Sequence, residues 1–153
     1  MGKYTPQGLQ KAVQGGEIQS SQDHRHNNQK QPQGREALLL SKYAGRAYTH
    51  YALLAGYTEI GETLEQTVHR EVMEEVGLQV KNLRYYKSQP WGVDGNVLMG
   101  FFCDVDGSNA IHIDENELSM AAWYPRDALP ARDDGISLTR EMIRIFEEGK
   151  EPK

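Results

Sequence analysis

The chain has 153 residues, a formal net charge of −5, 25% charged residues and 38% hydrophobic residues, which suits one soluble domain with its own core. The negative charge excludes a general binder of nucleic acid or membrane surfaces, because phosphate groups attract clustered Lys and Arg. Cys103 is the only cysteine, so neither an internal disulfide nor a cysteine-based zinc site is expected. No apolar run approaches the ~20 residues of a membrane span, and a reducing cytoplasm is the expected compartment.

Residues 1–34 form a polar segment that differs from the rest of the sequence. The segment holds eight glutamines and the run SSQDHRHNNQKQPQG, with few large apolar side chains. Such a segment buries too little apolar surface to offset its conformational entropy, so we expect disorder, with a short helix around residues 9–13 as an alternative. A globular domain is expected over residues 35–153.

Short apolar segments separated by turn-rich sequences predict a set of strands in this domain. Two helices of different character accompany the strands. One spans residues 64–76, and the other carries the apolar stripe Leu138, Met142, Ile145 and Phe146 and ends near Gly149. This mixture favours an α/β or α+β fold in which a mixed sheet lies between helices. The expected strands are residues 37–40, 51–55, 82–87, 97–105, 111–113 and 121–124.

The helix over residues 64–76 has clear signals at both ends. Thr63 followed by Gln66 is typical of a capping box, and Gly77 suits the left-handed position after the last turn. Apolar residues recur every four positions and predict a buried stripe made of Leu64, Val68 and Val72. The opposite surface of the helix is therefore expected to face solvent or a ligand.

The same helix concentrates carboxylates in the stretch REVMEEVG, which begins at Arg70. Glu71 and Glu75 are four positions apart, and Glu74 lies three from Glu71, so each like-charged pair destabilises the helix by about 0.2–0.5 kcal/mol. Arg70 can offset part of this repulsion through Glu74, one turn on. An acidic solvated face is the simplest interpretation. However, the helix dipole also disfavours acids near the C-terminus, and a divalent cation with oxygen ligands would resolve both conflicts.

These residues match a known signature. The stretch GYTEIGETLEQTVHREVMEEVGL resembles a complete Nudix box, the motif of hydrolases that act on nucleoside diphosphates linked to another moiety. The segments LRYYKSQPW, NVLMGFF and IDENELSMAAWYPRDALP extend the resemblance to the NADH pyrophosphatase (NAD diphosphatase) branch of that family. The box positions are Gly56, Glu62, Arg70, Glu71, Glu74, Glu75 and Gly77.

The resemblance implies a Nudix fold that binds Mg²⁺ or Mn²⁺, without zinc, and hydrolyses the diphosphate bond of a dinucleotide such as NADH or NAD⁺. The products would be AMP and nicotinamide mononucleotide. It further implies a supporting role for Glu62 behind the metal ligands. The implied catalytic residues are Arg70, Glu71, Glu74 and Glu75, and the implied metal ligands are Glu71, Glu74, Glu75, Glu117 and the carbonyl of Ala55.

The SQPW motif at residues 88–91 is diagnostic of the branch and is expected to contact the substrate. The branch usually continues with Pro-Phe-Pro-x-Ser, whereas this sequence has GVDGN at residues 92–96. An ADP-ribose or other nucleoside-diphosphate-sugar pyrophosphatase is therefore an alternative, and a non-catalytic nucleotide-binding module is a second. The expected substrate contacts are Tyr57, Ser88, Gln89, Pro90, Trp91 and Asn96.

The resemblance also shapes the expected partners and the sheet. A small dinucleotide or nucleoside diphosphate is the expected partner, with neither membrane nor DNA, and a homodimer remains an open alternative to a monomer. Members of the branch commonly carry an N-terminal domain and a four-cysteine zinc ribbon, neither of which this sequence displays. The glutamine-rich segment also replaces the apolar strand usual just before residues 37–40, so the sheet is expected to lack that strand.

Overall fold

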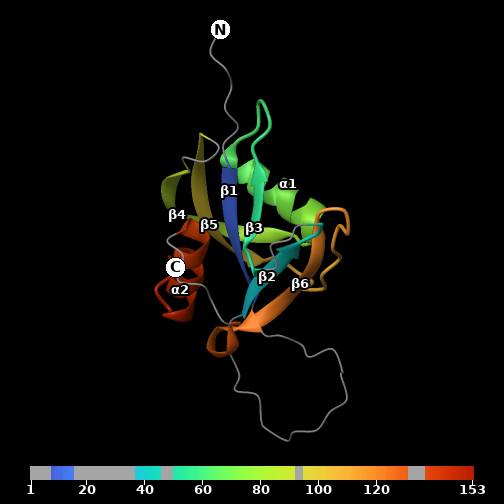
Figure 1. The fold of residues 1–153 in the computed structure, drawn as a ribbon, viewed down its shortest axis with the longest axis vertical. Helices are drawn as coiled ribbons and strands as arrows, with labels where there is room; N and C mark the ends of the chain where they lie inside the picture. Colours follow the sequence, from blue (N-terminus) through green and yellow to red (C-terminus); the bar gives the residue numbers. More distant parts are fainter. Residues whose placement is uncertain (1–7, 16–36, 46–49, 92–94, 131–136) are drawn as a thin grey trace, which may run out of the picture.

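A computed structural model describes residues 8–15, 37–45, 50–91, 95–130 and 137–153, with backbone only for the first segment. These residues form one mixed sheet with a helix on each side (Figure 1). The strands are β1 (Gly8–Gly15), β2 (Ala37–Tyr43), β3 (Leu54–Tyr57), β4 (Val80–Trp91), β5 (Asn96–Val105) and β6 (Leu118–Pro125). The helices are α1 (Leu64–Val76), the short 3-10 helix η1 (Arg126–Ala128) and α2 (Leu138–Glu147).

The strand order across the sheet is β4-β5-β1-β2-β6, and β3 also pairs with β1. β1 runs parallel to β5, whereas its pairings with β2 and β3 are antiparallel. The first half of β1 pairs with β3 and its last two residues pair with β2, so one edge of β1 serves two partners. The predicted α+β architecture, with a mixed sheet between helices, is confirmed.

The N-terminal segment provides the first correction. The short helix expected around residues 9–13 is wrong, because Gly8–Gly15 is the strand β1 near the middle of the sheet. The strand expected to be missing before Ala37 is therefore present in the sheet. Backbone hydrogen bonding along both edges of β1 outweighs the weak local preference of its side chains. The disorder expected elsewhere in residues 1–34 falls on 1–7 and 16–34, which lie outside the described residues.

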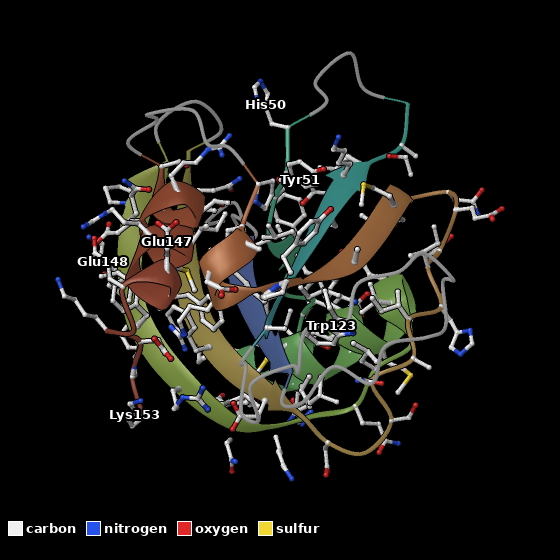
Figure 2. All side chains as sticks on the ribbon, turned by 90° about the horizontal axis from the view of Figure 1, so that it is seen from below. His50, Tyr51, Trp123, Glu147, Glu148 and Lys153 are labelled. Carbon is white, nitrogen blue, oxygen red and sulfur yellow. The ribbon has the colours of Figure 1, made fainter. Side chains whose placement is uncertain are left out.

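The sheet separates two apolar clusters because successive side chains of a strand point to opposite faces. In β2, Leu39 packs in the cluster of α1, whereas Leu38 and Leu40 pack in the cluster of α2. In Figure 2, Trp123 of β6 lies on the side of α1 and Tyr51 lies on the opposite side, in agreement with these two clusters. Both helices are therefore held by their apolar stripes on a shared sheet.

Three details of the predicted elements are corrected. Residues 111–113 form no strand; instead the His112 and Asp114 amides donate hydrogen bonds of 2.9 Å to carbonyls in the last turn of α1. The strand expected at residues 51–55 is shifted to Leu54–Tyr57. The buried stripe of α2 also contains Ile143, which was not predicted, whereas the predicted Ile145 is partly buried against the same cluster. Across the described ranges, no helix is long and apolar enough to cross a membrane.

Candidate active site on helix α1

The ends of α1 follow the sequence signals. The Thr63 side-chain oxygen accepts a hydrogen bond from the Gln66 amide at 3.1 Å, and the Gln66 side chain accepts one from the Thr63 amide at 2.9 Å. Gly77 has a φ of 69°, and its amide donates a hydrogen bond to the Met73 carbonyl. Because both ends are capped, the register of the helix is defined, and its acids face the loop that follows β3.

Arg70 is the centre of the polar face of α1. Its guanidinium binds Glu62 through Nε at 2.7 Å, Glu71 through Nη1 at 2.8 Å and Glu74 through Nη1 at 3.2 Å. Nη2 also donates to the Tyr57 carbonyl at 3.0 Å. The Arg70–Glu74 pair expected from their spacing is therefore present, together with two further carboxylates. One cation gathers three acids that would otherwise repel one another.

Glu62 is the most firmly held of these acids. The guanidinium of Arg70, joined by the amide of Glu59, lowers the pKa of Glu62 to about 2. Thr67, which is fully buried, donates from its hydroxyl to Glu62 at 2.7 Å. Because its oxygens are occupied by these donors, Glu62 holds the guanidinium of Arg70 in one orientation.

Thr67 is a residue that the sequence analysis missed. Its hydroxyl oxygen lies 3.3 Å from that of Thr58 and 3.0 Å from the Thr63 carbonyl oxygen. The spacing could have identified it, because Thr67 lies three and four positions before Arg70 and Glu71 and so shares the polar side of the helix with them. Its spacing of four from Thr63 placed it one turn inside the helix, next to the loop that carries Glu62.

A close approach joins the loop to the helix at Gly56. A Cβ atom on Gly56 would lie 2.3 Å from both Cδ and Oε2 of Glu71, which is far inside van der Waals contact. Only a glycine allows the Glu71 carboxylate to lie against this backbone. Ala55, whose carbonyl is an implied metal ligand, is the neighbouring residue of β3. The structure thus brings Glu71 beside the segment that carries Ala55.

Glu75, near the end of α1, and Glu117, just before β6, form a second part of the candidate site. Glu75 as a whole residue is only 2% exposed, whereas the side chain of Glu74 is 59% exposed. The Asp114 amide donates to the Glu75 carbonyl at 2.9 Å, and the amide of Glu117 donates to the Asp114 carbonyl at 3.0 Å. The loop that carries Glu117 is therefore attached by its backbone to the turn that carries Glu75. The Glu117 side chain itself is exposed at the start of β6.

The expected substrate contacts are spread over several elements. Tyr57 is 54% exposed at the end of β3, and Ser88 and Pro90 are exposed on β4. Asn96 is nearly buried at the start of β5, and Gln89 accepts a hydrogen bond from the first amide of α2. Trp91 ends β4, but its side chain lies outside the described residues, as does the loop 92–94.

The donor chemistry of the α1 face fits a hard divalent cation, because carboxylate oxygens from Glu71, Glu74 and Glu75 occur within two turns. In the part of the chain that the structure describes, no three acidic, histidine or cysteine side chains already surround one point as a ligand set. Glu71 and Glu74 are instead gathered by Arg70. A metal ion bound there would either share these carboxylates with Arg70 or take its place.

Comparison with known proteins identifies close relatives over part of their length. The chain is 45% identical over 106 residues to an NAD-capped RNA hydrolase NudC from Erwinia tasmaniensis, covering 69% of this chain and 40% of the relative. It is 45% identical over 111 residues to a protein of the same name from Chromobacterium violaceum, covering 72% and 41%. The chain thus spans about two fifths of the length of the curated relatives that it matches.

Solved structures agree on the fold at lower identity. A NUDIX hydrolase from Nitrosomonas europaea is 20% identical with a TM-score of 0.66, covering 95% of this chain and 73% of that one. The NUDIX domain of Shewanella oneidensis NrtR, solved with ADP ribose, is 15% identical with a TM-score of 0.64, covering 96% and 89%. The model of the NUDIX domain family matches residues 27–146, which include the capped helix, Arg70 and its carboxylates. This chain belongs to the Nudix family.

Proposed function

We propose that this chain hydrolyses the diphosphate bond of a dinucleotide such as NADH or NAD⁺, giving AMP and nicotinamide mononucleotide. The observation that carries the proposal is the acidic face of α1, where Arg70 binds Glu62, Glu71 and Glu74 and where Glu71 lies against Gly56. The names of the curated relatives, which share 45% identity with this chain, support a substrate that contains NAD.

In the proposed reaction, the oxygen of water attacks one phosphorus of the diphosphate and the bridging P–O bond breaks. The bridging oxygen leaves on the other phosphate, and the proton of water is released. Glu74 is the most exposed of the acids Glu71, Glu74 and Glu75, so we assign it the acceptance of that proton. Arg70 keeps the carboxylates in position through its ion pairs and needs no contact with the substrate.

Nudix hydrolases use divalent metal ions, and such an ion, when bound, neutralises negative charge on the phosphate oxygens. We propose Mg²⁺ or Mn²⁺, because glutamate and carbonyl oxygens are hard ligands. The proposed ligands are Glu71, Glu74, Glu75, Glu117 and the carbonyl of Ala55. No zinc requirement is proposed, since the sequence has one cysteine, Cys103, and that residue is buried in the core.

An NAD-capped RNA is a second candidate substrate, favoured by the names of the relatives. A free dinucleotide and a dinucleotide at the end of an RNA present the same diphosphate bond, so the α1 face would treat them alike. The two differ in charge, because the capped RNA continues beyond the adenosine as a negatively charged phosphate backbone and the free dinucleotide does not. The net charge of −5 on this chain favours the smaller substrate, because like charges repel a polyanion at low ionic strength.

Turnover of NADH, NAD⁺, ADP-ribose and an NAD-capped RNA with Mg²⁺ or Mn²⁺ tests the proposal, with products separated by chromatography. Release of AMP and reduced nicotinamide mononucleotide from NADH is the expected result. Preferential cleavage of ADP-ribose, with NADH untouched, would replace the proposal by the sugar-nucleotide alternative. Binding of nucleotide without any cleavage would instead identify a non-catalytic module. Addition of a zinc chelator should leave the rate unchanged.

A further inference from the structure

The end of β4 that carries the SQPW motif lies beside α2, on the face of the sheet opposite α1. α2 approaches the sheet closely at Gly100 of β5, where a Cβ atom would lie 2.8 Å from the Met142 sulfur and 3.4 Å from Leu138 Cδ2. Leu138 and Met142 are both fully buried. The first turn of α2 is therefore seated on β5, next to β4, with no room for a larger residue between them.

Three side chains of β4 reach α2. The Tyr86 hydroxyl donates to Glu141 at 2.8 Å, and the Lys87 ammonium lies 2.7 Å from the same carboxylate. Adjacent strand residues normally point to opposite faces, but the register of β4 against β5 shifts between residues 85 and 88, where one extra residue forms a bulge. Gln89 makes the third contact: its side-chain oxygen accepts a hydrogen bond of 2.7 Å from the Leu138 amide.

The strand register explains why Gln89 points toward α2. Ser88 pairs with Met99, which packs in the α1 cluster, whereas Gln89 pairs with Leu98, which packs in the α2 cluster. Directly paired residues share a face of the sheet, so Ser88 and Gln89 lie on opposite faces. A continuous motif in a strand cannot direct all its side chains toward one substrate.

The Leu138 amide is a group that needs this acceptor. Leu138 is the first residue of α2, so its amide has no carbonyl partner within the helix. Ser137 caps the same end by accepting a hydrogen bond from the Arg140 amide at 3.4 Å, which leaves the Leu138 amide to another acceptor. Gln89 supplies that acceptor from a strand 49 residues earlier in the sequence.

We propose that Gln89 is a positioning residue, which holds the SQPW end of β4 on the first turn of α2 and acts on substrate binding through that attachment. This inference rests on the proposed function for its kinetic part only. Loss of the acceptor would let the SQPW end of β4, together with its partner strand β5, shift relative to the first turn of α2. The affinity for the dinucleotide would then fall, whereas the acids of α1, which lie on the other face, would keep their arrangement.

Two substitutions separate this role from direct contact with the substrate. Gln89→Met has nearly the same shape but lacks the acceptor oxygen. Gln89→Glu keeps an acceptor at the same reach, and its negative charge is favourable at a helix N-terminus. The same charge would repel a diphosphate if residue 89 contacted the substrate. Gln79→Met, at an exposed position just before β4, is the matched control for loss of a glutamine.

The experiment measures amide exchange at Leu138 by NMR, together with KM and kcat for NADH. We expect Gln89→Met to accelerate Leu138 exchange by about 3- to 10-fold and to raise KM on the order of 5-fold, with kcat nearly unchanged. Gln89→Glu should keep both the Leu138 exchange rate and the KM near their wild-type values, and Gln79→Met should match the wild type. The proposal is overturned if Gln89→Met leaves Leu138 exchange unchanged, or if Gln89→Glu keeps normal exchange yet loses NADH binding. If wild type leaves NADH intact, the proposed function fails, and exchange at Leu138 alone decides the attachment.

Discussion

Arg70 binds Glu62 with two hydrogen bonds, from Nε to Oε1 at 2.7 Å and from Nη2 to Oε2 at 2.9 Å. This paired geometry matches the planar guanidinium to the planar carboxylate, and it also raises the pKa of Arg70 above its ordinary value. The third nitrogen, Nη1, remains directed at Glu71 and Glu74. Glu62 thus sets the orientation from which Arg70 holds the acids of α1.

Replacement of Arg70 by lysine tests this arrangement. Arg70→Lys keeps the positive charge but cannot bind Glu62 through two parallel hydrogen bonds while also reaching Glu71. We expect kcat/KM for the dinucleotide to fall by about 10- to 100-fold, with a small change in thermal stability. Arg144→Lys, at an exposed ion pair on α2, is the matched control and should retain full activity. Equal activity of Arg70→Lys and wild type would show that the geometry of the guanidinium is unimportant.

The stability of the fold should depend on the ionisation of Glu62. Its folded-state pKa of about 2 lies below its ordinary value of 4.5, so the unfolded chain binds a proton more readily. The stabilisation is therefore complete above about pH 4.5 and is lost as the pH falls toward 2. Thermal unfolding in chelator should show a smaller drop in Tm over this range for Glu62→Gln than for wild type. Parallel pH profiles of the two proteins would contradict the assignment.

Glu75→Gln tests the metal assignment. The side chain is buried and glutamine has nearly the same volume, so the fold should remain intact. Turnover should fall on the order of 100-fold or more, because an amide is a poorer ligand than a carboxylate for a hard cation. Calorimetric titration with Mn²⁺ should show weaker binding. Glu65→Gln, at an exposed position in the first turn of the same helix, should behave as wild type in both measurements.

The two close approaches at glycines predict that an added methyl group lowers activity at Gly56 but lowers stability at Gly100. Gly56→Ala places a Cβ atom 2.3 Å from the Glu71 carboxylate, so it should displace that side chain and lower kcat/KM on the order of 100-fold with little change in stability. Gly100→Ala places one 2.8 Å from the Met142 sulfur and should lower the free energy of unfolding by about 1–3 kcal/mol. Activity of Gly100→Ala should persist below its Tm. Equal loss of activity in both variants would indicate a general packing defect.

The helix that carries the acids could be predicted from the sequence almost to the residue. Its limits, Leu64–Val76, its capping box and its left-handed Gly77 all agree with expectation. These features depend on contacts between residues a few positions apart, which the order of amino acids contains directly. The ion pair between Arg70 and Glu74 is also a contact between residues four positions apart, and it too could be predicted from the sequence.

The wrong predictions share a dependence on distant partners. Gly8–Gly15 is polar enough to suggest a tail, yet β5 on one edge and β2 and β3 on the other make it a strand. Residues 111–113 resemble a strand in sequence, yet the amides of His112 and Asp114 donate hydrogen bonds to carbonyls in the last turn of α1. In both segments the local preference is weak, and backbone groups take whichever hydrogen-bond partners the rest of the fold supplies.

The sequence by itself determined which groups α1 carries: a capped helix with one acidic face and an arginine, Arg70, next to Glu71 and one turn from Glu74. Only the tertiary structure decided how those groups are supported. Glu62 and Thr67 come together because a loop folds back on α1, and Gln89 faces α2 because a bulge and strand alternation direct it there. Local patterns encode which groups are present, whereas long-range packing, set by the whole chain, decides which of them meet.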